Sequence, residues 1–188
     1  TLLYNIIRII AEQKYGKCLG LWDLSKVKSE YNAYIVKKHD FDPWICLRSK
    51  YLAFSYRDVR SVLVSAYKFN KTNPEIQIVD SCIMQYLEAR KRGAKCFSYE
   101  YIVNNKEDIV YDISSDMSAH VDSKNIIKEL NNLSVGNYTD GYCEVTLMHP
   151  NHVTGSSNDS WEDYIDNKLL LEINQKYSWW FKENGYPV

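Results

Sequence analysis

Apolar residues recur in short periodic stretches along the whole chain, and no stretch is long enough to cross a lipid bilayer. A membrane-spanning helix needs roughly 18 consecutive apolar residues, and no run of this sequence approaches that length. Apolar residues three and four positions apart predict helices, whereas alternating apolar residues predict strands. Both patterns are present. We therefore expect an α+β domain with five to six helices around a small, mainly antiparallel sheet of about four to six strands.

Six stretches carry the helical spacing, and turn or capping residues bound most of them. Gly16 ends the first stretch, Gly93 the fourth and Gly185 the last, as expected of glycine at helix C-termini. Ser55 with Asp58 three residues later resembles a capping box ahead of the third stretch. The predicted helices are residues 2–15, 27–39, 59–67, 74–92, 126–133 and 161–184.

Short or alternating apolar segments predict the strands. Two short strands are expected at residues 44–47 and 51–54. The longest alternating pattern runs from Cys96 to Ser114 with polar residues at its centre, so it predicts a β-hairpin. A further strand is expected from Tyr142 to Met148, followed by a loop to Ser160. Because hairpins join antiparallel strands, the sheet is expected to be largely antiparallel.

The length of 188 residues fits one globular domain over residues 1–188, since domains commonly span roughly 100 to 200 residues. The five cysteines are widely separated and form no C-x-x-C pair, which favours free thiols and a reducing compartment, the cytoplasm. Lys, Asn, Ile and Tyr are abundant and have A/T-rich codons. This composition favours a viral or phage origin, in which case the compartment is the host cytoplasm.

Charge is distributed unevenly between the two halves of the sequence. Residues 1–94 carry 16 Lys and Arg against 9 Asp and Glu, whereas residues 95–188 carry 7 against 15. The formal net charge of −1 is therefore the sum of +7 and −8, and all six arginines lie in the first half. Two interpretations remain open. Either a basic face meets a polyanion, or the two halves fold over each other and neutralise across their contact.

A basic and aromatic N-terminal half is typical of proteins that bind single-stranded nucleic acid, because bases stack on aromatic rings and phosphates attract cations. We therefore expect an intracellular binding or accessory protein whose partner is RNA or single-stranded DNA, or an acidic protein surface. Arg90 and Arg92 have a second explanation, because they lie in the last turn of the helix predicted at 74–92, where the macrodipole favours cations. The expected binding residues are Arg48, Lys50, Tyr51, Tyr56, Arg57, Arg60, Arg90 and Arg92.

The second hypothesis is a metal-dependent or histidine-based phosphodiester hydrolase centred on the loop of His149 and His152. These two histidines are its candidate catalytic residues, and Cys143, His149 and His152 are candidate ligands of a divalent metal such as zinc. The order of strand, loop and helix superficially resembles the layout of ββα-metal nucleases without their fuller signature, so no roles are carried over. A surface loop without chemistry is the alternative interpretation.

Missing glycine motifs exclude several enzyme classes. The sequence has neither G-x-x-x-x-G-K-[ST] nor G-x-G-x-x-G, so P-loop nucleotide hydrolysis and dinucleotide redox chemistry are not expected. The metal of the second hypothesis is the only cofactor that the sequence suggests.

Three aromatic residues, Trp179, Trp180 and Phe181, are adjacent on the last predicted helix. At most two of three neighbouring side chains on a helix can face one core, so we expect at least one ring at the boundary or on a partner surface. This pattern supports a third hypothesis, a protein–protein inhibitor that docks through its Trp-rich C-terminal helix.

Overall fold

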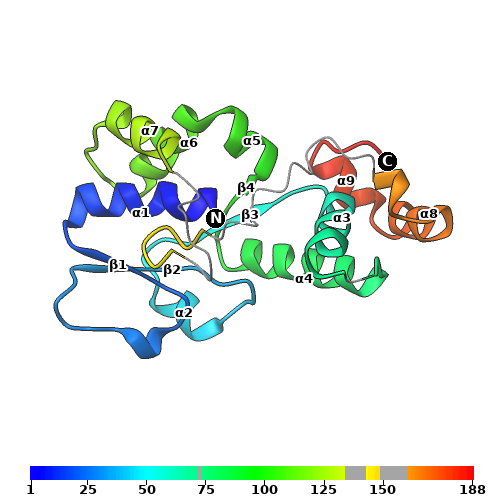
Figure 1. Cartoon of the computed structure of the whole chain (residues 1–188), viewed down its shortest axis with the longest axis horizontal. Helices are drawn as coiled ribbons and strands as arrows, with labels where there is room; N and C mark the ends of the chain where they lie inside the picture. The colour runs from blue at the N-terminus through cyan, green and yellow to red at the C-terminus, as the bar shows by residue number, and fades with distance from the viewer. Residues whose placement is uncertain (72, 134–142, 149–160) are drawn as a thin grey trace. The chain divides into compact units, whose positions relative to one another are not determined.

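The computed structural model is a mostly helical α+β fold with two small sheets (Figure 1). It describes residues 1–71, 73–133, 143–148 and 161–188. Contacts between Cα atoms divide the chain into two compact units, here called unit 1 and unit 2. Unit 1 comprises Thr1–Tyr51 and Glu100–His152, and unit 2 comprises Leu52–Tyr99 and Val153–Val188. The expectation of one domain stays a prediction.

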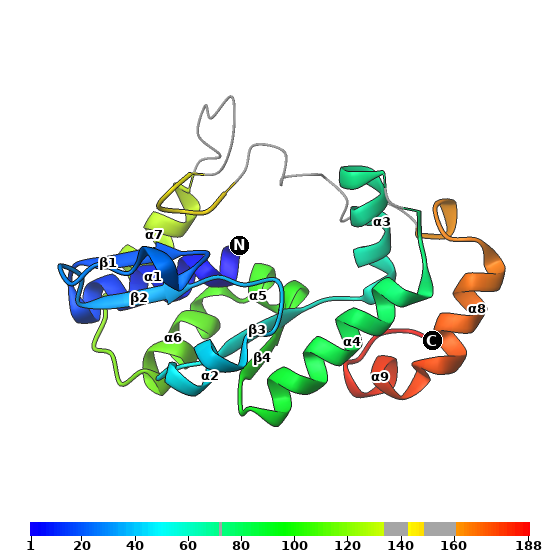
Figure 2. The same ribbon diagram turned by 90° about the horizontal axis from the view of Figure 1, so that it is seen from below.

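Unit 1 is built around helix α1 (Leu2–Tyr15), which lies between a sheet and a pair of helices (Figures 1 and 2). On one side it contacts the parallel strands β1 (Cys18–Leu21) and β2 (Ala33–Val36). On the other side it contacts α6 (Lys106–Asp116) and α7 (Ser123–Asn131). A helix covered on both sides needs apolar residues around most of its circumference. The buried apolar residues of α1 are Leu3, Tyr4, Ile6, Ile9, Ile10 and Ala11.

Three shorter elements complete the regular structure of unit 1. They are the 3-10 turn η1 (Leu24–Lys26), the helix α2 (Pro43–Arg48) and the helix α5 (Tyr99–Asn104), which enters unit 1 at its second residue. Residues 143–148 are tied to α1, because the Asn5 side-chain amide donates to the backbone oxygen of Thr146 at 3.0 Å.

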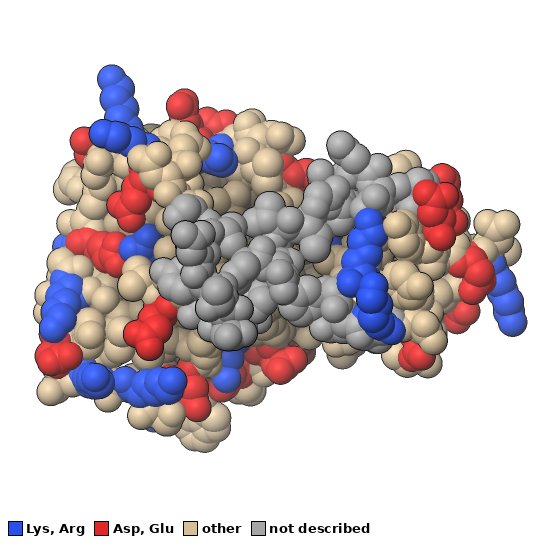
Figure 3. All heavy atoms as spheres, in the orientation of Figure 1, with Lys and Arg blue, Asp and Glu red and all other residues tan. Residues whose placement is uncertain are grey.

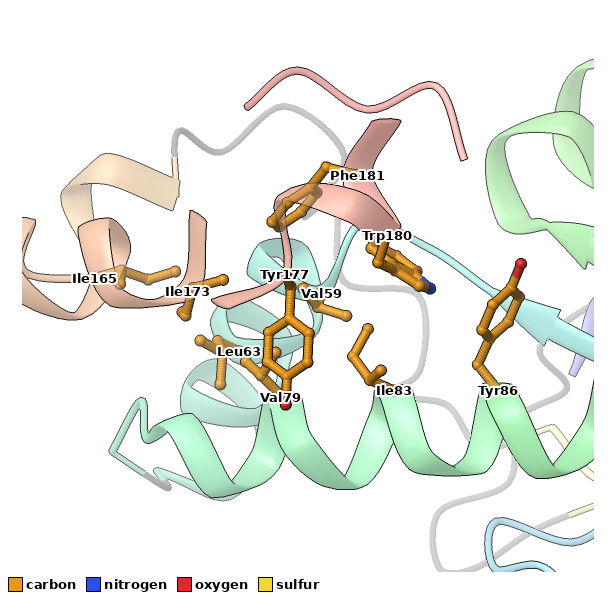
Figure 4. Packing of buried hydrophobic residues seen from close by; sticks show 10 residues of the cluster. All are labelled: Val59, Leu63, Val79, Ile83, Tyr86, Ile165, Ile173, Tyr177, Trp180 and Phe181. Carbon is orange, nitrogen blue, oxygen red and sulfur yellow. The ribbon is translucent and has the colours of Figure 1, made fainter. Parts of the chain in front are cut away.

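Unit 2 joins a second small parallel sheet to four helices. Strands β3 (Ala53–Tyr56) and β4 (Lys95–Ser98) pair with each other, and between them in sequence lie α3 (Val59–Asn70) and α4 (Ile76–Lys91). The C-terminal part adds η4 (Trp161–Asp163), α8 (Asn167–Lys176) and α9 (Ser178–Glu183). Figure 4 shows the core where these helices meet: Val59, Leu63, Val79, Ile83, Tyr86, Ile165, Ile173, Tyr177, Trp180 and Phe181.

The buried Arg60 joins several parts of unit 2. Its guanidinium pairs with the Asp58 carboxylate (Nη2 to Oδ2, 2.6 Å) and donates to the backbone oxygen of Pro187 at 2.7 Å. The same group lies 4.5 Å from the ring centroid of Trp161 and 4.4 Å from that of Phe181. Arg60 is only 1% exposed, so its charge stabilises the fold and is not presented at the surface.

The predicted α+β class is confirmed, but the predicted antiparallel sheet of four to six strands is wrong. The described residues form two parallel two-stranded sheets, in which Cys18 pairs with Ala33 and Ala53 pairs with Lys95 at the first positions. Parallel partners require a crossover between the strands. In unit 2 this crossover is the α3–α4 pair, and local sequence patterns do not reveal such a distant pairing.

The predicted hairpin over residues 96–114 is wrong beyond its first strand. Residues up to Ser98 form β4, but α5 and α6 follow it. After β4, the alternating tyrosines that suggested strands are exposed, with Tyr111 72% exposed. The buried apolar residues that follow β4 are instead spaced as on helices: Ile102, Ile109, Val110 and Ile113.

Two further predictions in the first fifty residues are wrong. The expected helix over 27–39 is replaced by an irregular segment and β2, whose Ile35 is buried. The expected strand over 44–47 is the helix α2, because the Asp42 side chain accepts the backbone N–H groups of Trp44 and Ile45, and Pro43 suits the first helical position.

The remaining helix predictions are confirmed with changed limits. The helices predicted at residues 2–15, 59–67 and 74–92 correspond to α1, α3 and α4. Of the helix predicted at 126–133, residues 126–131 belong to α7. Asp58, not Ser55, caps α3. The single terminal helix is divided into η4, α8 and α9.

The strand predicted at Tyr142–Met148 is absent from the described residues 143–148. These form a turn in which Leu147 donates its backbone N–H to the Cys143 oxygen at 2.8 Å. Among the described residues, no helix has the length and apolar character needed to cross a membrane.

Candidate nucleic-acid interface

The charge difference between the two halves of the sequence does not become a charge difference between the two units. Each unit combines one segment of the first half with one of the second. Among the described residues, unit 1 carries 12 Lys and Arg against 13 Asp and Glu, and unit 2 carries 11 against 9. On the face drawn in Figure 3, blue and red side chains are mixed over both units. The described part of each unit is therefore close to neutral, and the interpretation that the halves neutralise across their contact stays a prediction.

A positive region nevertheless persists within unit 1. Residues 17–50, here called the basic segment, carry 7 Lys and Arg against 4 Asp and Glu, whereas residues 100–133 carry 3 against 7. In Figure 3, blue side chains recur among red ones along the lower left edge, over the part of unit 1 that contains β1 and β2. The basic segment includes both of these strands and α2.

Two acids of the basic segment accept backbone N–H groups. Asp23 accepts the N–H of Ser25 and also interacts electrostatically with Lys38 and Lys26, and Asp42 caps α2. Lys17 makes the segment's one ion pair among the described residues, with Glu30 at 3.7 Å. Five exposed cations form no ion pair with a described carboxylate: Lys26, Lys28, Lys38, Arg48 and Lys50.

Aromatic rings lie next to the cations of the basic segment. The Lys17 ammonium is 4.6 Å from the ring centroid of Tyr31, and the Arg48 guanidinium is 5.8 Å from that of Trp44. Cations placed in this way are attracted to the negative face of the ring. Of these two cations, Lys17 pairs with Glu30, whereas Arg48 forms no ion pair with a described carboxylate. An aromatic face beside a cation is the combination that single-stranded nucleic acids use for stacking and phosphate contact.

Helix α2 presents the most exposed part of this combination. Trp44 is 69% exposed and Leu47 is 71% exposed, and with Arg48 they occupy positions three and four residues apart on one side of the helix. The opposite side, with Ile45 and Cys46, is partly buried. The sequence did not suggest Trp44 as a binding residue, because a strand was predicted there. The Asp42–Pro43 start signal could have indicated the helix that exposes it.

Lys37 is buried, unlike the neighbouring Lys38. It is only 9% exposed, its ammonium donates to the Thr1 hydroxyl at 2.8 Å, and it lies 4.5 Å from the ring centroid of Trp22. Burial lowers its pKa to about 8. His39 stacks on Trp22, and burial, with a smaller effect from Lys37, lowers its pKa as well. Lys37 is therefore less accessible to a ligand than the exposed lysines.

The structure divides the predicted binding residues between the two units. Arg48, Lys50 and Tyr51 lie in unit 1, and Tyr56, Arg57, Arg60, Arg90 and Arg92 lie in unit 2. The Tyr51 hydroxyl is buried without a hydrogen-bond partner among the described residues, and burial together with Asp116 and Asp112 raises its pKa. The Tyr51 hydroxyl is therefore less accessible to a ligand than the exposed indole of Trp44.

The predicted residues of unit 2 are largely engaged within the fold. Tyr56 packs edge-on against Tyr86 and Trp180, and Arg60 is buried. Arg57 donates to the backbone oxygen of Ser61 at 2.7 Å. Arg90 pairs with Glu183, and Arg92 is exposed at the end of α4. Of the eight predicted residues, Arg48 and Lys50 are therefore the ones that fit the candidate interface.

The predicted hydrolase site falls mostly outside the described residues. His149 and His152 are not among them, so their candidate catalytic and metal roles stay predictions. Cys143 is buried, and its sulfur accepts the backbone N–H of Thr146 at 3.4 Å. Within the described ranges, no three His, Cys, Asp or Glu residues are grouped so that they could hold a metal ion.

The expectation for the three adjacent C-terminal rings is confirmed. Trp180 and Phe181 are 1% and 0% exposed in the core of unit 2 (Figure 4). Trp179 is 43% exposed. The docking role of this helix stays a prediction.

Comparison of the chain with protein-family models, with curated protein sequences and with solved structures finds no significant match.

Proposed function

We propose that this protein binds nucleic acid, RNA or single-stranded DNA, through the basic segment of unit 1. The observation that carries the proposal is the set of five exposed cations that lack an ion pair among the described residues, one of which, Arg48, lies beside an indole that is 69% exposed. Unpaired surface cations release counterions from a phosphate backbone on binding, which is the main source of affinity in such complexes. An acidic protein surface is the second candidate partner, because it would meet the same charges.

The cellular setting proposed for this activity is the cytoplasm, or the host cytoplasm for an accessory protein of a virus or phage. All five cysteines are free, which supports a reducing compartment. The intracellular setting also gives the protein access to RNA.

The proposal is tested by measuring the affinity of the full chain for labelled RNA and single-stranded DNA over a series of salt concentrations. We expect binding at low salt that weakens as salt increases, with a logarithmic slope of about 0.7 for each phosphate contact to a single strand. The triple variant Lys26→Gln, Lys28→Gln, Lys38→Gln should bind more weakly and with a smaller slope. The absence of binding at low salt would refute the proposal.

A matched control removes charge from the same unit outside the basic segment. Lys124 and Lys128 are exposed on α7, so Lys124→Gln with Lys128→Gln should leave the affinity close to that of the wild type. Competition with polyglutamate separates the two candidate partners. If polyglutamate binds as tightly as RNA at the same charge concentration, the acidic protein is the better assignment.

A further inference from the structure

The large, mainly apolar side chain of Trp44 is exposed to solvent. It is 69% exposed, compared with 43% for Trp179 and 1% for Trp180. Leu47, one turn further along α2, is 71% exposed. An exposed apolar group of this size gains little from the fold, because the hydrophobic contribution grows with the area removed from water. The indole is therefore accessible to a ligand.

The local backbone fixes the direction of the Trp44 side chain. Asp42 accepts the backbone N–H groups of Trp44 at 3.0 Å and of Ile45 at 3.3 Å, and the Ser49 hydroxyl donates to the Ile45 oxygen at 2.6 Å. These bonds cap the start of α2 and hold its other end, so Ile45 turns inward and Trp44 turns outward. The indole is thus presented by an ordered turn of helix.

Two exposed cations follow Trp44 in the chain, whereas the acid just before it, Asp42, caps α2. The Arg48 guanidinium lies 5.8 Å from the indole centroid, and Lys50 follows two residues later. Both are exposed and form no ion pair with a described carboxylate. A ligand that covers the indole therefore also meets cations, so the ligand that fits has a flat apolar face next to a negative charge. An unpaired nucleobase with its phosphate has this chemistry.

We infer that Trp44 is a stacking platform for an unpaired base, with Arg48 and Lys50 contacting the adjacent phosphates. This inference rests on the proposed function and adds selectivity to it. A base inside a duplex is stacked on its neighbours and does not offer its face to a protein, whereas a base in a single strand does. The basic segment thus selects single strands over duplexes through Trp44.

Two other ligands fit α2 less well. Helices that lie in a membrane interface present a continuous apolar face. Helix α2 has only six residues, and Trp44 and Leu47 are its two large exposed apolar side chains. An acidic peptide would satisfy Arg48 and Lys50 but needs no exposed indole. Both ligands appear below as outcomes of the test.

The test compares the binding of a short labelled oligouridine with that of an RNA duplex of the same length. The variants are Trp44→Ala and Trp44→Phe in the full chain, and Trp179→Ala is the matched control because it removes an exposed Trp from unit 2. We expect Trp44→Ala to weaken binding to oligouridine roughly tenfold or more, because one stacking contact is lost. Trp44→Phe should lose less, and Trp179→Ala should match the wild type.

Duplex binding and salt dependence supply the second readout. Trp44→Ala should leave the weak affinity for the duplex and the salt slope unchanged, because no charge is removed. Arg48→Gln with Lys50→Gln should weaken binding to both ligands and reduce the slope. Because Trp44 is exposed, Trp44→Ala should melt at the wild-type temperature, so a lower affinity cannot be attributed to unfolding.

Each alternative outcome has a separate meaning. If neither RNA binds at low salt, the proposed function fails and the inference fails with it. If both bind with a salt dependence that the lysine variants reduce, but Trp44→Ala binds like the wild type, the proposed function stands and the inference is overturned. Equal affinity for duplex and oligouridine also overturns it. The inference is also overturned if Trp44→Ala reduces binding to anionic vesicles or to polyglutamate but not to oligouridine.

Discussion

The hydroxyl oxygen of Tyr4 occupies the place that a side chain on Gly20 would need, since a Cβ built on Gly20 lies 1.7 Å from that oxygen. Tyr4 reaches across β1 and donates to the backbone oxygen of Val145 at 3.0 Å. Burial raises the pKa of Tyr4 to about 12, so the hydroxyl keeps the proton that it donates. Glycine inside a strand often marks such a close approach. Gly20 is therefore part of the contact that holds residues 143–148 on α1.

Replacing Gly20 by alanine should destabilise unit 1, because the new Cβ and the Tyr4 hydroxyl cannot occupy the same space. Overpacking of this kind costs about 1–3 kcal/mol in the free energy of unfolding. Tyr4→Phe alone should cost about 1 kcal/mol through the lost hydrogen bond to Val145. In the double variant the hydroxyl is gone, so the two costs should not add. A double-mutant cycle by chemical denaturation measures this coupling, and strictly additive costs would contradict the steric explanation.

Arg60 should be the charged residue whose loss damages unit 2 most. Arg60→Ala leaves the Asp58 carboxylate, itself only 9% exposed, without its partner and should cost about 3–5 kcal/mol of stability. Arg60→Lys keeps the charge but cannot reproduce the paired N–H groups, so we expect it to be destabilising too. Arg48→Lys, on the exposed side of α2, is the control and should change stability by less than about 0.5 kcal/mol. Equal midpoints of urea unfolding for the Arg60 and Arg48 variants would contradict this role.

The buried Lys37 should make stability depend on alkaline pH. Its pKa is about 8 in the folded protein and 10.5 in its unperturbed state, so the unfolded chain binds the proton more tightly between these values. Stability should therefore rise with pH through this window, by up to about 3 kcal/mol, and the cost of burying the ammonium is present in full below it.

The Lys37 contribution is isolated by comparison with Lys37→Met. At neutral pH the variant should be more stable than the wild type, and its advantage should shrink as the pH rises above about 8. Lys38→Met changes the exposed neighbouring lysine and is the control, with no such trend expected. The measurement is the free energy of unfolding of the three proteins at several pH values. A difference between Lys37→Met and the wild type that stays constant with pH would count against a pKa of Lys37 lowered by burial.

Two adjacent tryptophans should respond very differently to the same substitution. Trp180 is 1% exposed and contacts Tyr86 and Phe181, so Trp180→Ala should cost about 3–5 kcal/mol by leaving a cavity. Trp179 is 43% exposed, and Trp179→Ala should cost much less. Thermal unfolding of the two variants tests this difference. Similar losses would mean that the outer ring is also part of the core.

The structural elements that the sequence predicted correctly are those whose signals are local. In α1 the apolar residues Leu3, Ile6 and Ile10 recur within each turn, and Gly16, with a φ of 79°, ends the helix. The three rings at 179–181 were separated into core and surface by the same local geometry. Interactions between residues three or four positions apart are visible in the sequence itself, which is why these predictions succeed.

The candidate interface was predictable only in part. Arg48 and Lys50 follow from the positive charge of the first half, but Trp44 was assigned to a strand and was missed. Arg60 looked like a binding residue in the sequence, yet it is buried beside Asp58. A list of charges does not say which cations already have an acid or a ring as a neighbour in the fold.

The sequence by itself determined that the protein is an α+β fold with amphipathic helices, where α1, α3, α4 and α7 lie, and that charge differs between its halves. The tertiary structure alone decided that the strands pair in parallel, that residues 99–104 and 106–116 are helical, and that each unit mixes segments of both halves. The physical reason is range. Helix formation depends on neighbours within a turn, whereas strand pairing, burial and charge compensation depend on residues brought together from distant parts of the chain.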